Sequence, residues 1–213
     1  MTVRINKPAL NLREELTKAQ SVVPYVQQQF WMDGLVENGT FDSDTAWTKG
    51  AGWTISGGQA VQTGTASNNI YQNGVTEDGK NYLITVNVLQ NDGSCSLRTA
   101  NGATIIGSVI DTTGLFSFVF TASGTRIDFR SGFNTANVII DDIKVFEVDE
   151  NDEVIHSLPL GWKPLHVYED GLIQREGDVH DYTVVKTGGA YAIKPAVQPT
   201  ATTETCVIAE REL

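Results

Sequence analysis

The sequence predicts a mainly β protein with a helix at its N-terminus, a central β-sandwich and a small β domain at its C-terminus. Apolar residues recur at helical spacing near the N-terminus, and short runs of alternating apolar and polar residues follow. Gly, Thr, Ser and Asn are frequent, while charged residues make up only 19% of the chain. Short strands joined by Gly and Asn turns produce this kind of composition. We place the three segments at residues 1–33, 34–149 and 150–213.

The N-terminal segment is expected to be helical because its apolar side chains recur every three or four residues. Asn11 is a suitable N-cap, and Glu14 follows at the spacing of a capping box. The apolar residues form a heptad seam for oligomerisation, made of Leu12, Leu16, Ala19, Val23, Val26 and Phe30. Pro24 predicts a kink or two short helices, because proline lacks a backbone donor. The seam packs either against copies of itself, most simply in a homotrimer, or against its own domain.

The central segment contains several short runs with the alternation of β-strands. The expected strands span residues 53–56, 59–62, 82–89, 115–121, 125–130 and 138–148. Gly57 and Gly58 separate the first two runs, as in a two-residue hairpin. Several short strands at regular spacing indicate a sandwich.

The C-terminal segment opens with an acidic linker at residues 149–153 and continues as short strands. These strands are expected at residues 165–168, 172–175, 181–186, 191–193 and 205–209. A domain of roughly 60 residues is marginally stable alone. We therefore expect it to pack on the sandwich or on another subunit.

Composition excludes several classes of function. A net charge of −11 argues against a nucleic-acid partner, since phosphate binding needs clustered Lys and Arg. Residues 1–20 have no apolar run, so we expect no signal peptide, and no stretch is long enough to insert in a membrane. Cys95 and Cys206 are too few and too far apart for a disulfide framework. Synthesis in a reducing host cytoplasm is therefore expected, with release by another route such as lysis.

No arrangement of residues predicts catalysis, so we expect a protein that is not an enzyme. His156, His166 and His180 have no cysteine or second histidine at metal-binding spacing. The sequence contains neither a glycine-rich phosphate loop before a helix nor a nucleophile elbow. Adjacent acids such as Asp141 and Asp142 face opposite ways on a strand and cannot flank a glycosidic bond together.

Motifs at both ends of the central segment carry a family resemblance. Residues 35–42 read LVENGTFD, Trp47 and the hairpin at Trp53 follow, and residues 140–143 read IDDI. This pattern resembles the jelly-roll carbohydrate-binding modules that bind xylan and β-glucan, which belong to the galactose-binding-like sandwiches. The resemblance covers about half of the chain and implies a jelly-roll fold with glycan binding and no catalytic activity.

The same resemblance implies a structural calcium that joins the two ends of the module, at the positions of Asp42 and Asp141. Asp141 also alternates with Ile139 and Ile143, which places its carboxylate on the apolar side of a strand. A buried carboxylate needs a cation or converging hydrogen-bond donors. Thr40 stands where the family motif often has an acid. The alternative to calcium is that hydrogen bonds at a sheet edge satisfy Asp141.

Sugar binding requires an exposed aromatic ring with polar neighbours, because pyranose faces stack on rings. Trp47 and Trp53 occupy positions that the family packs in its core. Tyr71 and Phe133, which we expect in loops, are the candidate contacts with a glycan. The alternative is that both rings pack against their own loops.

The outer segments resemble the virion proteins of marine phages. The shared motifs are RINKP at residues 4–8, LREEL at 12–16, VYEDG at 167–171 and DYTV at 181–184. This likeness implies a tailed-phage structural protein on the virion surface, as a capsid decoration, head fibre or tail fibre. Its partners would be other virion proteins of the capsid or tail, and its contact with host glycans would be weak. The alternative is a carbohydrate-binding module without catalytic activity.

Overall fold

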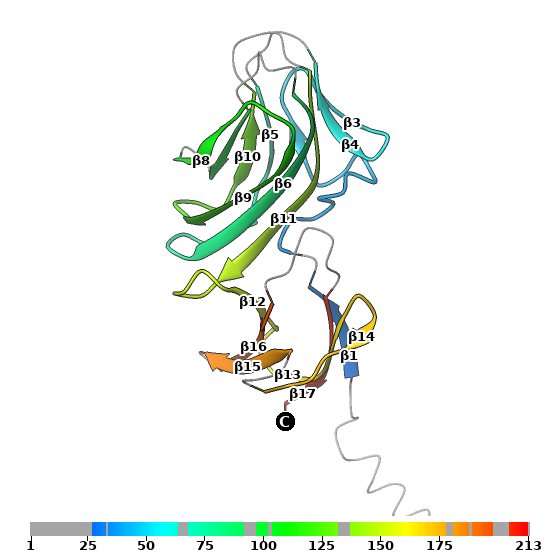
Figure 1. Ribbon diagram of the computed structural model, residues 1–213, viewed down its shortest axis with the longest axis vertical. Helices are drawn as coiled ribbons and strands as arrows, with labels where there is room; N and C mark the ends of the chain where they lie inside the picture. Colours follow the sequence, from blue (N-terminus) through cyan, green and yellow to red (C-terminus); the bar gives the residue numbers. More distant parts are fainter. Residues whose placement is uncertain are drawn as a thin grey trace, which may run out of the picture.

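A computed structural model describes most of the chain from residue 27 onward. The described residues are 27–32, 34–63, 68–91, 97–101, 104–131, 137–177, 181–187, 189–197 and 205–212. The regular secondary structure of these residues consists of β-strands. None of these residues forms a helix that could cross a membrane. Figure 1 shows the sandwich and a smaller C-terminal module following one another along the long axis.

Strands β2 to β11 build the sandwich. Their bounds are β2 Thr48–Lys49, β3 Trp53–Ser56, β4 Gln59–Gln62, β5 Asn69–Gln72, β6 Asn81–Asn91, β7 Leu97–Asn101, β8 Thr104–Ile110, β9 Gly114–Thr121, β10 Ile127–Arg130 and β11 Val138–Val148. A five-stranded sheet has the order β2-β5-β10-β7-β8, and the facing sheet is built around β11, which pairs with β4 and β6. The β-sandwich predicted from the sequence is confirmed.

Alternating side chains of the two sheets fill the space between them. Ile70 and Phe129 enter it from the five-stranded sheet, and Ile84 and Ile140 enter it from the facing sheet, all without solvent exposure. Burying a side chain of this size stabilises the fold by about 1.5–3 kcal/mol. The hairpin predicted at Gly57 also forms, as β3 and β4 pair across the turn.

The two ends of the sandwich meet beside the core. Phe41 and Trp47 are buried with their ring centroids 5.3 Å apart, and Trp47 lies 6.3 Å from Phe129. The amide of Ile143 donates to the carbonyl of Gly39 at 3.0 Å. A Cβ atom at position 39 would lie 2.0 Å from the Ile143 carbonyl oxygen, so this close approach requires glycine.

The remaining strands form the C-terminal module. Their bounds are β1 Gln27–Trp31, β12 Val154–Ser157, β13 Trp162–Glu169, β14 Leu172–Ile173, β15 Tyr182–Thr187, β16 Ala190–Pro195 and β17 Thr205–Arg211. One sheet has the order β1-β17-β13-β14, while β15 pairs with β16 and β16 pairs with β12. Because β12 also pairs with β11, it links this module to the sandwich.

The acidic residues between β11 and β12 form a tight turn. The Asp149 carboxylate accepts the amides of Asn151 and Glu153 at 2.8 and 3.1 Å. Its other oxygen accepts from the Lys194 ammonium at 2.7 Å, and this contact is the main cause that lowers the pKa of Asp149 to about 2. Lys194 lies on β16, so the turn connects the linker predicted at residues 149–153 to the C-terminal module.

The prediction of an N-terminal helix is wrong for residues 27–31. Gln27–Trp31 is strand β1, and all five of its residues pair with β17 in an antiparallel register. Phe30 packs edge-on against Trp162, with ring centroids 5.2 Å apart, so it belongs to the C-terminal core and to no helical seam. The partner strand lies at the far end of the chain, where helical periodicity cannot reveal it. Leu12, Leu16, Ala19, Val23 and Val26 lie outside the described residues.

The position of Phe30 predicts a loss of stability in the C-terminal module when its ring is removed. Phe30→Ala should lower the free energy of unfolding by about 2 kcal/mol, less than for a fully buried ring because Phe30 is only half-buried. Denaturant unfolding measures this change, with Gln28→Ala on the exposed side of β1 as the control. Equal stability of the two variants would contradict the packing.

Candidate functional site

Strand β10 and Arg126, the residue before it, carry charged and apolar residues in strict alternation. Ile127 and Phe129 point into the sandwich core and are fully buried. Arg126, Asp128 and Arg130 alternate with them and therefore face the other side of the five-stranded sheet. The two core residues thus fix which way all three charged side chains point.

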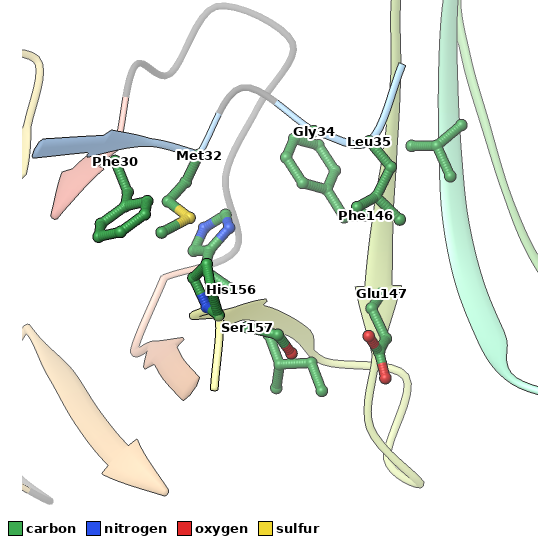
Figure 2. A pocket seen from close by; sticks show the side chains of 11 residues that line it. Phe30, Met32, Gly34, Leu35, Phe146, Glu147, His156 and Ser157 are labelled. Atoms are coloured by element: carbon green, nitrogen blue, oxygen red, sulfur yellow. The ribbon is translucent and has the colours of Figure 1, made fainter. Parts of the chain in front are cut away.

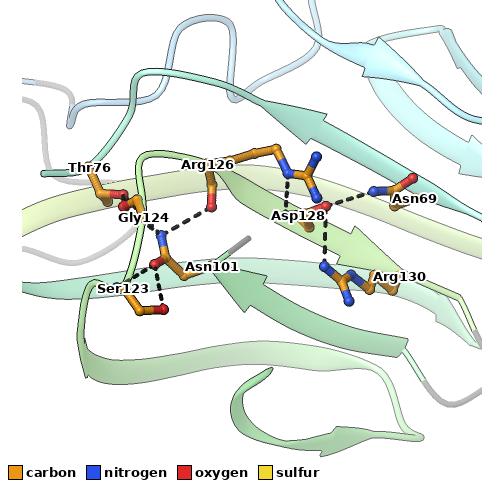
Figure 3. A network of polar contacts seen from close by, with 8 residues as sticks. All are labelled: Asn69, Thr76, Asn101, Ser123, Gly124, Arg126, Asp128 and Arg130. Carbon is orange, nitrogen blue, oxygen red and sulfur yellow. Dashed lines mark hydrogen bonds and ion pairs between the residues drawn. The ribbon is translucent and has the colours of Figure 1, made fainter. Parts of the chain in front are cut away.

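Asp128 is the centre of a polar network on this outer face, although its exposure is 0%. One carboxylate oxygen accepts from Nε of Arg126 at 2.9 Å, and the other accepts from Nδ2 of Asn69 at 2.7 Å. Nη2 of Arg130 lies 3.7 Å from the same carboxylate, as Figure 3 shows. A carboxylate removed from water needs partners of this kind. Both arginines are therefore oriented toward one point on the sheet.

Tyr71 lies on the same face, next to this carboxylate. It belongs to β5, where its Cα partners are Asp128 on β10 and Thr48 on β2. The guanidinium of Arg126 lies over the Tyr71 ring, 4.6 Å from the ring centroid. Such a cation–π contact stabilises both groups in one arrangement. The structure thus places the predicted glycan contact Tyr71 on a strand, whereas Phe133 lies outside the described residues.

A second network holds the start of β10 in place. Asn101 is 1% exposed, and its Nδ2 donates to Oγ1 of Thr76 at 3.0 Å and to the carbonyl of Arg126 at 3.1 Å. Its Oδ1 accepts from the amide of Ser123 at 2.7 Å (Figure 3). The Asn101 side chain therefore forms hydrogen bonds with backbone groups in the segment between β9 and β10, outside the strand pairing. This fixes the backbone from which the Arg126 side chain leaves.

The residues that surround Tyr71 were not predicted from the sequence. They are Asn69, Asn101, Arg126, Asp128 and Arg130. A signal was present, because residues 126–130 read RIDFR, with charges on one face of a predicted strand and apolar residues on the other.

Asp42 and Asp141 lie near one another at the junction of the two sandwich ends. Burial raises the pKa of Asp141, and the carboxylates of Asp142 and Asp42 raise it further, while a hydrogen bond from the Asp142 amide at 2.8 Å opposes the shift. Asp42 accepts from Oγ1 of Thr40 at 2.7 Å. The structure therefore brings the two predicted calcium residues close enough to repel one another.

The donors at this junction fit calcium only in part. Calcium takes about 6–8 oxygen ligands. Within the described ranges, no three His, Cys, Asp or Glu side chains converge as a metal site. Lys144 lines the adjacent cavity of about 330 Å³, and its ammonium disfavours a cation there. Backbone carbonyls would have to supply most of the ligands, so the calcium at Asp42 and Asp141 stays a prediction.

A separate cavity of about 220 Å³ lies where the sandwich meets the C-terminal module (Figure 2). Its apolar lining includes Phe30, Met32, Val145, Phe146, Ile155 and Pro159. His156 also lines it and is 4% exposed, and its Nε2 has no hydrogen-bond partner among the described residues. Burial lowers the pKa of His156 to about 4, so the ring is neutral near pH 7. The ring lies edge-on to Phe146 at 5.8 Å, which makes this joint an apolar contact.

Comparison with known proteins gives structural likeness alone. No family model and no curated protein matches the chain. A solved structure described as "CBM4 structure and function" is similar over 53% of this chain and 99% of its own, at 15% identity and a TM-score of 0.39. A mutant of a carbohydrate-binding module of family 29 is similar over 57% and 92%, at 13% identity and a TM-score of 0.36. With TM-scores below 0.5, these similarities assign neither a ligand nor a site to this chain.

The calcium prediction is tested by melting experiments. If Asp42 and Asp141 hold the ion, calcium at a hundredfold excess over its dissociation constant should stabilise the native state by about 2.7 kcal/mol. The melting temperature should then be higher in calcium than in EDTA, and Asp141→Ala should abolish the difference. The same melting temperature of the wild-type protein in calcium and in EDTA would reject the site.

Burial of His156 predicts a loss of stability in acid. Because its pKa in the folded state lies below the ordinary value of 6.5, protonation favours the unfolded chain. Stability should therefore fall as the pH is lowered from about 6.5 to 4, by up to about 3 kcal/mol. His156→Leu should lack this part of the pH dependence, and the exposed His166→Leu should retain it. Unfolding measured across this range checks both, and parallel curves for His156→Leu and the wild type would refute the assignment.

Proposed function

We propose that this chain is a glycan-binding protein without catalytic activity, and that its ligand binds on the outer face of the five-stranded sheet around Tyr71. The observation that carries the proposal is the stacked pair of Tyr71 and Arg126 beside the buried carboxylate of Asp128. Aromatic rings contact sugar rings, and directional polar groups recognise their hydroxyls. Asn69, Arg126 and Arg130 supply such groups next to the ring.

Contacts within the protein hold the side chains of this arrangement in place. Asp128 holds Arg126 and Asn69 through hydrogen bonds of 2.9 and 2.7 Å, and the Tyr71 ring supports the Arg126 guanidinium from one side. Binding costs less when side chains are already ordered, because less conformational entropy is lost. Burying a charged group on an outer sheet face contributes little net stability. A binding role therefore accounts for this network better than a stabilising role does.

The same contacts argue against a glycosidase. Glycoside hydrolysis uses two carboxyl groups about 5–10 Å apart, one on each side of the bond. Among the contacts of the described residues, the network around Tyr71 contains one carboxylate, that of Asp128, whose oxygens are held by Arg126 and Asn69. An acid committed to two partners and without exposure cannot transfer a proton to a sugar. The proposed activity is therefore binding alone.

The setting proposed for this module is the surface of a tailed-phage particle, in the capsid or the tail. It rests on the sequence likeness at residues 4–16 and 167–184, and the homotrimer and the virion partners likewise stay predictions of the sequence. The described contacts favour the glycan-binding module over a purely structural virion role. Many copies on one particle would strengthen a weak contact, because later contacts become intramolecular.

Removing the Tyr71 ring should remove glycan binding. We expect the wild-type protein to be retarded in gels that contain a recognised polysaccharide, and Tyr71→Ala to bind it at least tenfold more weakly, a loss of about 1.4 kcal/mol. Tyr191→Ala is the matched control, since the Lys186 ammonium lies over the Tyr191 ring at 4.3 Å in the C-terminal module. Affinity electrophoresis over a panel of polysaccharides measures both. Retention of binding by Tyr71→Ala, or no binding by the wild type, would contradict the proposal.

A further inference from the structure

We propose that the sugar bound at this face is anionic, carrying a carboxylate or a sulfate group, and that the Arg126 guanidinium recognises that group. This inference rests on the proposed function and names the class of its ligand. Three observations support it: the Arg126 guanidinium lies over the Tyr71 ring, two arginines adjoin one carboxylate, and hydrogen bonds to Asp128 orient the side chains around it.

The stacked pair offers a cation on one side of the ring. The guanidinium of Arg126 lies 4.6 Å from the Tyr71 centroid, so it occupies ring surface on which a neutral pyranose would stack. A ligand on that side meets a flat guanidinium in place of a bare aromatic face. Arginine binds carboxylate and sulfate-like oxyanions through two parallel hydrogen bonds, which makes this platform selective for them.

The network places two guanidinium groups beside one buried carboxylate. Asp128 is one carboxylate, and it is shared by the guanidinium groups of Arg126 and Arg130. The side chains of both arginines are about one-third exposed, at 33% and 32%, whereas that of Asp128 is buried. Both arginine side chains therefore reach solvent in part, and the side chain of Asp128 does not. In a chain with a net charge of −11, this face attracts anions that the rest of the surface repels.

Arg126 keeps hydrogen-bonding capacity for a ligand. Its side chain contacts the described residues through Nε, which donates to Asp128 at 2.9 Å, and through the stack on Tyr71. A guanidinium has five N–H donors in a fixed plane, so the donors of its two Nη atoms remain available. Asp128 and Asn101 act as positioning residues, since one holds the Nε edge and the other holds the Arg126 carbonyl at 3.1 Å.

An anionic glycan fits these observations better than a nucleic acid does. Duplex binding needs a row of cations that neutralises several phosphates along the backbone. One guanidinium on an aromatic ring, flanked by a second arginine and an amide, matches a single acidic sugar with hydroxyl groups. We therefore assign the anion to a sugar and use a nucleic acid as a control.

The test compares charged and neutral polymers of the same backbone. The probes are polygalacturonate against its fully methyl-esterified form, and dextran sulfate against dextran, which separates carboxylate from sulfate recognition. We expect the full-length protein to bind at least one anionic polymer tenfold or more tightly than its neutral counterpart. Raising the salt from about 0.05 to 0.5 M should remove most of that preference, because exposed charges are screened.

Substitutions then locate the anion. Arg126→Gln should bind the preferred anionic polymer at least tenfold more weakly. Arg126→Lys should recover part of the affinity, because lysine restores the positive charge without the planar set of donors. Arg175→Gln is the control, since this exposed arginine pairs with Asp181 in the C-terminal module and its loss should change binding less than twofold. Melting temperatures verify that the variants fold. The salt titration of the unmodified protein tests the preference without any substitution.

The outcomes separate this inference from the proposed function. Equal affinity for charged and neutral polymers, with Tyr71→Ala still abolishing binding, would overturn the anionic ligand and leave glycan binding intact. Absence of binding to every polymer would overturn both. Equally tight binding of a single-stranded DNA oligonucleotide would show general attraction of polyanions and would also overturn the assignment to a sugar.

Discussion

The alternation along β10 is the constraint on which both the core and the proposed binding face depend. Ile127 and Phe129 are fully buried between the two sheets, and this burial forces Arg126, Asp128 and Arg130 to the outer side. A register shift of one residue would bring three charges into the core. The apolar packing of the sandwich therefore determines the position of each charged group, and the site needs no separate scaffold.

Asp128 orients the side chains on this outer face through hydrogen bonds. A buried carboxylate is costly unless cations and donors surround it, and here Arg126 and Asn69 supply them at 2.9 and 2.7 Å. The cost of desolvation makes these partners hard to remove, so they hold the guanidinium over Tyr71. The same interaction that satisfies Asp128 thus orients the cation that faces solvent. One buried carboxylate therefore holds the side chains of the proposed binding face in place.

The C-terminal module is joined to the sandwich by backbone pairing and an apolar contact. Strand β12 pairs with β11 on one side and with β16 on the other, and His156 projects from it into the cavity at the joint. Strand β1 forms the edge of the β1-β17-β13-β14 sheet by pairing with β17, although β1 and β17 are far apart in the sequence. The small module is thereby closed by residues that precede the sandwich in the sequence. The pairing of β1 also brings Phe30 into the core of the C-terminal module, where it packs against Trp162.

The sequence by itself determined what depends on local pattern. Period-two alternation revealed the long strands, the hairpin followed from adjacent glycines at Gly57 and Gly58, and Tyr71 stood out as an aromatic ring among polar neighbours. Only the tertiary structure decided what depends on contacts between distant segments. Residues 27–31 continue a helical spacing, yet they form a strand because β17 supplies partners for their backbone groups. Likewise, Tyr71 acquires its cation and the neighbouring Asp128 because pairing of β5 with β10 brings them side by side, and no pattern within either strand contains that information.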